Sequence, residues 1–222
     1  KIAPDAPHAL HMPSHIFTRV GAWQDSVAGN RRSADVAKKD GNGNEAFHAA
    51  DYMVYANLQL GRDQAARQVL DEFNREVKTN PAIFVGPYAA AAIPARLAVE
   101  RSDWAAASQL PQQGGQFAFV EAITTFSRAL GAARKGDAAA AEQDAAKLET
   151  QHKALLEAKN NYWATEVEVQ RVAAAAWIAK AKGQNDEALR LMRAAADIED
   201  RNEKHIVTPG RVVPARELLG EM

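Results

Sequence analysis

The residues best suited to chemistry in this chain are histidines near its start. His8, His11 and His15 follow one another at spacings of three and four residues, so they share one face of a helix. A later helical segment repeats this spacing with a histidine, an aspartate and a tyrosine, namely His48, Asp51 and Tyr55. Two neighbouring helices could therefore present one polar, imidazole-rich wall.

This histidine cluster permits three kinds of chemistry. The imidazoles could simply satisfy buried polar groups and pack against aromatic residues such as Phe17 and Tyr52. Alternatively, they could join Arg19 to bind a carboxylate or phosphate, with a positive charge that grows as the pH falls through about 6.5. The third alternative is a metal ion, because imidazole nitrogens are common ligands of zinc and other transition metals.

Helix geometry limits the metal alternative. His11 could chelate one ion with either His8 or His15, but His8 and His15 lie about 10.5 Å apart along a straight helix. A fuller ligand set needs His48 or Asp51 from the second helix, and two histidines with one carboxylate would suit zinc. The HExxH signature of zinc proteases is absent. No resident cofactor is therefore expected unless this cluster holds a transition metal.

Composition excludes several classes of protein. The 222 residues contain no cysteine, which excludes disulfides, thiolate zinc sites and cysteine nucleophiles. A formal net charge of −1 without a basic run does not favour nucleic acid or an anionic membrane as partner. No apolar run reaches the roughly 18 residues that would span a bilayer. We expect a soluble protein, cytoplasmic or periplasmic, with an oligomeric state that the sequence leaves open.

Both ends of the sequence are unusual. The chain starts with lysine instead of methionine, and an apolar pattern resumes at 212–219 and stops before a further helix could pack. We therefore expect a segment of a longer protein.

The chain contains an internal repeat. Apolar periodic stretches are interrupted by hexads that begin with Gly or Ser and end with a small residue: GAWQDS, GRDQAA, SDWAAA, GDAAAA and GQNDEA. The closing residues recur at intervals of 34 to 47 residues, which is typical of stacked helix hairpins. Strand patterns are nearly absent, so the predicted class is all-α. Helices are predicted over 6–20, 24–39, 45–60, 64–79, 87–100, 104–110, 117–135, 138–159, 162–182 and 186–203.

Prolines and glycines predict where this pattern is interrupted. Pro13 falls inside the first predicted helix and removes a backbone donor, so the helix should kink or restart there. The stretch LPQQGGQ at 110–116 predicts a break between helices.

The hexads, with Trp23 and Trp104 before the second helix, resemble the tetratricopeptide repeat. The block HMPSHIFTRVGAW, which has the form HMPxHIxxRxGxW, and the later HAADYMVYANLQLG further resemble bacterial tetratricopeptide-like proteins over most of residues 4–80. The resemblance implies one right-handed α-solenoid over 1–222 whose concave groove recognises a peptide. Its repeats would cover about 6–40, 44–80, 86–112, 116–159 and 160–204, with a partial repeat at 210–222.

The expected function is therefore non-catalytic recognition of a protein or peptide segment. Ten residues are expected in the groove, Arg19 as an anion-binding partner of the imidazoles and the other nine by counting back from each hexad: His8, His11, His15, Arg19, His48, Asp51, Tyr55, Arg96, Phe126 and Trp177. The alternative is a metal-binding or metal-dependent enzyme whose site comprises His8, His11, His15, His48 and Asp51. A purely structural assembly protein is a third alternative.

Overall fold

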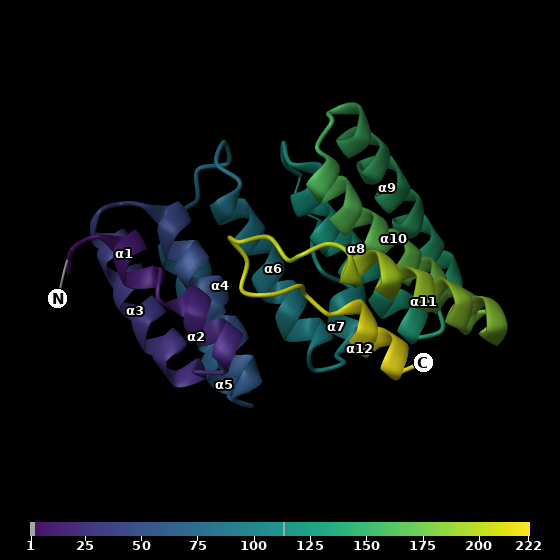
Figure 1. Ribbon diagram of the computed structural model, residues 1–222, viewed down its shortest axis with the longest axis horizontal. Helices are drawn as coiled ribbons and strands as arrows, with labels where there is room; N and C mark the ends of the chain where they lie inside the picture. The colour runs from purple at the N-terminus through teal and green to yellow at the C-terminus, as the bar shows by residue number, and fades with distance from the viewer. Residues whose placement is uncertain (1–2, 113) are drawn as a thin grey trace. The chain divides into compact units, whose positions relative to one another are not determined.

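The computed structural model describes residues 3–112 and 114–222. Over these residues the chain forms helices and connecting loops and no strand, which confirms the predicted all-α class. Figure 1 shows the order of the helices along the chain. None of the helices in this described part is both long and apolar enough to cross a bilayer.

The chain divides into two compact units. The described residues up to Leu97 form the first unit together with His205–Gly210, and the second contains the described residues of Ala98–Lys204 and Arg211–Met222. The first unit contains α1 (Pro7–His11), α2 (Ser14–Val20), α3 (Trp23–Lys39), α4 (Gly43–Gln59), α5 (Asp63–Glu76) and most of α6 (Val85–Val99). The second contains α7 (Trp104–Ser108), α8 (Ala118–Arg134), α9 (Ala138–Glu157), α10 (Asn161–Ala181), α11 (Asn185–Asp200) and α12 (Ala215–Gly220). One continuous solenoid over 1–222 stays a prediction.

The predicted hexads form turns between consecutive helices. The first residue of each hexad has a positive φ, for example 74° at Gly21 and 53° at Ser102, and reverses the chain after the preceding helix. The small residue that closes each hexad is completely buried: Ser26, Ala66, Ala107, Ala141 and Ala188. A small side chain at these positions lets two helices approach closely.

Helix α4 is the centre of the first unit. Its first turn is capped by Asn42, whose side-chain oxygen accepts from the Glu45 backbone N–H at 3.2 Å. The helix packs against both α3 and α5, and its side chains Phe47 and Met53 lie in a core that also contains Phe73. Nearly every residue of α4 is buried, so its polar residues are held in fixed positions.

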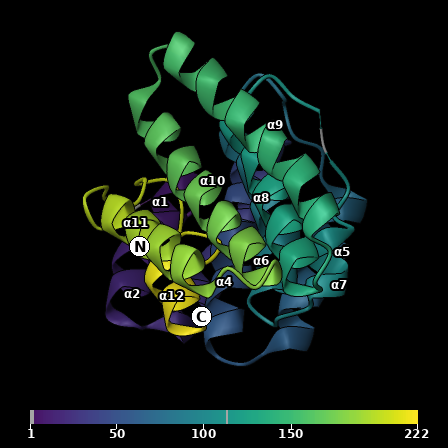
Figure 2. The ribbon, with the colours of Figure 1, turned by 90° about the vertical axis from the view of Figure 1, so that its right-hand side faces the viewer.

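Helices α8 to α11 form the body of the second unit. Each packs on the next along the chain, and α10 also packs on α8 (Figure 2). The predicted break at 110–116 falls between α7 and α8, although Gln113 lies outside the described residues.

The C-terminal part of the second unit differs from the prediction. The expectation that the chain stops before a further helix could pack is wrong, because α12 packs on α11 with Ala215 and Leu218 buried. The Ala215 backbone N–H donates to the Glu199 carboxylate at 2.8 Å, which holds the first turn of α12 on α11. Arg216 of α12 also pairs with Asp197 and Asp200 of α11.

Candidate functional site

Pro13 divides the predicted first helix and positions two of the histidines. Helix α1 ends at His11 and α2 begins at Ser14, with Pro13 as its N-cap. Pro13 has no N–H to donate, and the backbone tightens here: the His15 N–H bonds to the Met12 carbonyl, three residues back, at 3.2 Å. The predicted interruption at Pro13 is therefore confirmed.

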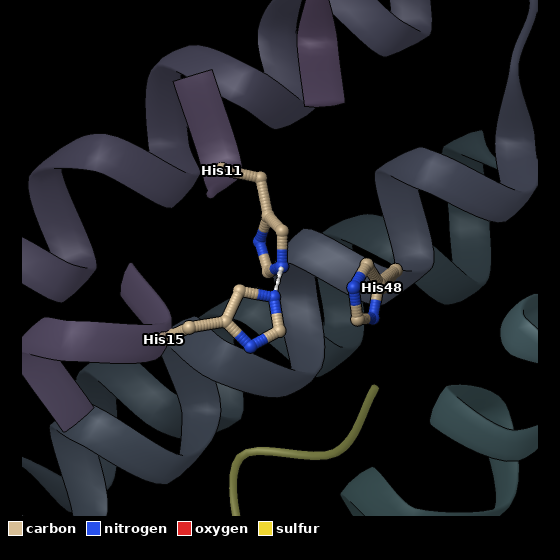
Figure 3. Close-up of side chains that lie close together, drawn as sticks. All are labelled: His11, His15 and His48. Carbon is tan, nitrogen blue, oxygen red and sulfur yellow. Dashed lines mark hydrogen bonds between the residues drawn. The ribbon is translucent and has the colours of Figure 1, made fainter. Parts of the chain in front are cut away.

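Three histidines from α1, α2 and α4 converge in the first unit. His11, His15 and His48 each offer a ring nitrogen, and these nitrogens all lie within 4.8 Å of one another (Figure 3). The ring centroids of His11 and His48 are 4.2 Å apart, and those of His11 and His15 are 4.8 Å apart. His11 is 0% exposed and His48 5%, so two of the three imidazoles are shielded from bulk water.

Hydrogen bonds hold the rings of His11 and His15 in place. The Nε2 atoms of the two residues lie 3.0 Å apart. On the far side of each ring, His11 Nδ1 is 2.6 Å from Asn30 Oδ1, and His15 Nδ1 is 3.1 Å from the Tyr52 hydroxyl. Each ring is therefore tethered by its Nδ1, and both Nε2 atoms face the centre of the cluster.

Burial keeps the His11 and His48 side chains uncharged at neutral pH. Desolvation is the main cause that lowers the pKa of His11 to about 4, although the hydrogen bond to Asn30 opposes it. Desolvation also lowers the pKa of His48, and the neighbouring histidines add to this effect. Because a neutral imidazole is the form that binds a metal, these two side chains are ready to act as ligands at pH 7.

Asp51 does not join the three histidines. Its Oδ1 accepts from Arg96 Nε at 2.8 Å, and both side chains are almost fully buried. Arg96 also donates through Nη2 to the Gly210 carbonyl at 2.6 Å and lies over the Tyr55 ring. This buried ion pair connects α4, α6 and the segment His205–Gly210 inside the first unit.

The other predicted site residues are not part of the three-histidine cluster, although the His8 ring centroid lies 6.0 Å from that of His11. His8 is exposed, and its Nδ1 lies 3.4 Å from a Glu45 carboxylate oxygen. Arg19 lies in the last turn of α2 and is exposed. Phe126 and Trp177 belong to the second unit, where both are buried. The structure thus brings together His11, His15 and His48 from the predicted set.

One contributor to the site was not predicted from the sequence. Asn30 is completely buried on α3, in a row with Ser26 and Ser33 that turns the same face inward. Polar residues at the helical spacing of a buried face are the signal that could have indicated its role. Tyr52, which one of the three alternatives placed against the imidazoles, packs on His15 and also bonds it.

The geometry can be compared with the needs of zinc. With Zn–N bonds of about 2.05 Å, two nitrogens of a tetrahedral site lie about 3.3 Å apart. The 3.0 Å separation of the His11 and His15 Nε2 atoms is near this value. All three ring nitrogens lie within 4.8 Å of one another, so a small movement of the rings would bring the more distant ones to the zinc geometry. Three imidazoles leave one position of a tetrahedral site for an external ligand.

Comparisons with protein-family models, curated proteins and solved structures found no match to this chain.

Proposed function

We propose that the first unit binds a divalent transition metal of the zinc class through His11, His15 and His48. The observation that carries this proposal is the convergence of three ring nitrogens within 4.8 Å of one another, two from the adjacent helices α1 and α2 and one from α4. Two of the rings are buried and neutral at pH 7, so they need not lose a proton before they bind.

The surroundings of the ligands support the same function. Metal-binding histidines commonly use their second nitrogen to bond a fixed partner, which orients the ring. Asn30 and Tyr52 supply such partners to His11 and His15 at 2.6 Å and 3.1 Å. Within the described part of the chain the His48 ring makes no side-chain hydrogen bond, so its nitrogens are available to a bound ion.

The ligand set also favours a particular chemistry. Three neutral imidazoles leave the full charge of a divalent ion uncompensated, and the open position would take water or an anion. Asp51 would not act as a base beside the ion, because it is engaged by Arg96. We therefore propose metal binding with one coordination position not filled by the three imidazoles as the core function, and hydrolysis or hydration as the reaction class to screen.

Metal analysis tests this proposal. Full-length protein purified without chelator is stripped and titrated calorimetrically with zinc, alongside His11→Ala and His48→Ala variants and a His152→Ala control from the second unit. We expect one zinc per chain in the wild type and the control, and a loss of at least about 10-fold in affinity in each site variant. Equal zinc binding by all four proteins would reject the site.

For the fold, we propose a tetratricopeptide-like arrangement of helix hairpins. It is supported by the left-handed residue that opens each hexad and by the completely buried small residue that closes it. Deep mutational scanning for stability tests the repeat: the closing position of every hexad should tolerate Gly, Ala and Ser only. Free substitution by leucine at these positions would contradict it.

A second candidate function is recognition of a protein or peptide segment, as a repeat scaffold would provide. The observation that favours it is a group of exposed apolar side chains beside the histidines: Ile16 and Val20 on α2, and Met12 just after α1. Four-residue spacing places Ile16 and Val20 on one face of α2. Exposed apolar rows commonly mark interaction surfaces.

Peptide display against the purified protein tests the second function. Peptides selected on the wild type are expected to lose binding to an Ile16→Ser, Val20→Ser double variant. Arg67→Ser, an exposed change on α5, serves as the control. Selected peptides that bind the double variant as well as the wild type would remove this face from consideration.

A further inference from the structure

The hydrogen bonds of Asn30 determine which nitrogen of His11 carries a proton. Asn30 Nδ2 donates to the Ser26 backbone carbonyl at 2.7 Å, and a carbonyl can only accept. The amide is therefore oriented with Oδ1 toward His11 Nδ1, 2.6 Å away. Since Oδ1 also only accepts, the hydrogen lies on His11 Nδ1, and the neutral ring keeps a lone pair on Nε2.

The same reasoning extends to His15. Its Nε2 lies 3.0 Å from the His11 Nε2, which must accept, so the hydrogen between them lies on His15. A neutral His15 then has a lone pair on Nδ1 and accepts from the Tyr52 hydroxyl, 3.1 Å away. Without metal, the cluster is a directed chain of donors that runs from Tyr52 through His15 and His11 to Asn30.

This row of hydrogen bonds is incompatible with metal binding in one respect. His11 already offers a lone pair at Nε2, toward the centre of the cluster. His15 offers an N–H there instead, and a protonated nitrogen cannot be a ligand. His15 must therefore change tautomer before its Nε2 can bind an ion.

We infer that metal binding switches His15 from the Nε2–H to the Nδ1–H tautomer, and that Tyr52 is the positioning residue for this switch. The inference rests on the proposed metal site and specifies how that site is gated. The proton on Nε2 leaves to water and Nδ1 takes a proton from water, so the ring stays neutral. The phenol keeps its own proton and changes from donor to acceptor toward Nδ1.

Tyr52 is suited to this position because a phenol both donates and accepts. It can bond His15 Nδ1 before and after the switch, which neither phenylalanine nor a carboxylate could do. Tyr52 is 1% exposed and lies four residues after His48 on α4, so one helix face carries both the third ligand and the positioning residue. Helix α4 thus positions both Tyr52, which bonds His15, and the ligand His48.

Nuclear magnetic resonance on the full chain with ¹⁵N-labelled histidine tests the switch directly. In metal-free protein we expect His11 protonated on Nδ1 and His15 on Nε2; with one equivalent of zinc, both should be protonated on Nδ1. A metal-free His15 already protonated on Nδ1, or a zinc-bound His15 still protonated on Nε2, would overturn the inference. Failure to bind zinc at all would overturn the metal site itself and the switch with it.

A Tyr52→Phe variant tests the role of the phenol, with Tyr162→Phe in the second unit as the matched control. We expect Tyr52→Phe to weaken zinc binding about 10-fold, as losses of such supporting hydrogen bonds do. It should also move the metal-free His15 Nδ1 resonance, which a merely structural role would leave unchanged. An unchanged affinity and an unchanged resonance would show that Tyr52 does not position His15.

Discussion

The Nε2 atoms of His11 and His15 lie 3.0 Å apart although Pro13 separates the two helices that carry these residues. Each ring is held from behind by a different helix, His11 by Asn30 of α3 and His15 by Tyr52 of α4. The pair is therefore a product of packing among four helices as well as of local spacing. This arrangement makes its properties sensitive to changes in the core of the first unit.

Acid should destabilise the metal-free protein between pH 6.5 and about 4. The pKa of His11 is lowered from 6.5 to about 4 by burial, so in this window the unfolded chain binds a proton that the folded protein does not. The contribution of His11 to the free energy of unfolding is fully present above pH 6.5 and is lost as the pH falls to about 4, a decrease on the order of 3 kcal/mol. Urea unfolding at several pH values in the presence of a chelator measures this decrease.

The matched variant for this prediction is His11→Gln. It removes the titrating group, so its stability should vary less with pH than that of the wild type across the same window. Parallel curves for the two proteins would show that His11 does not cause the pH dependence.

Loss of one partner from the Asp51–Arg96 pair should be strongly destabilising. Both side chains are nearly fully buried, so Asp51→Ala leaves an uncompensated guanidinium in the core and should cost about 3–5 kcal/mol. Replacement of both residues, as in Asp51→Ala with Arg96→Met, should cost less than Asp51→Ala alone. Chemical denaturation of the wild type and the two variants checks this order, and a double variant less stable than Asp51→Ala would contradict it.

The register of the second hexad predicts overpacking by Ala66→Leu. Ala66 is completely buried on α5, and extra methylenes there should cost roughly 1–3 kcal/mol. Gln68→Leu, two residues on and exposed, is the control and should change stability by less than about 0.5 kcal/mol. Equal melting temperatures for the two variants would mean that the hexad does not mark a close helix contact.

Gly131 marks a second close contact, between α7 and α8. A Cβ at this position would lie 2.6 Å from the Ser108 backbone nitrogen and 2.8 Å from the Trp104 carbonyl oxygen. Gly131→Ala should therefore push the two helices apart and cost about 1–3 kcal/mol. Gly220→Ala in α12 meets nothing within 4 Å and should be neutral or slightly stabilising. A stable Gly131→Ala protein would indicate that α7 moves freely on α8.

The fold was largely predictable because its signals are local. Glycines at helix ends and alanines at fixed spacing determine where helices stop and how closely they pack, and neither depends on distant residues. The docking of α12 was missed because it depends on Glu199, sixteen residues before Ala215, whose carboxylate bonds the Ala215 N–H. A helix too short to show a periodic pattern is recognised only through such contacts.

The site was predictable in part for the same reason. The spacing of His11 and His15 indicated a shared face, and His48 was expected from a neighbouring helix. The sequence could not show that Asp51 turns toward Arg96, because that pairing joins residues 45 apart through the packing of α4 on the rest of the unit. Nor could it show that Asn30 approaches His11, since this contact depends on how α1 packs on α3.

The measurement that tests the central claim most directly is X-ray absorption at the zinc edge of protein loaded with one equivalent of zinc. We predict three imidazole nitrogens at about 2.0–2.1 Å from the zinc and one oxygen ligand from water or an anion. His48→Ala should lower the imidazole count by one. A spectrum with fewer than two imidazoles, or one that His48→Ala leaves unchanged, would contradict a metal site built from His11, His15 and His48.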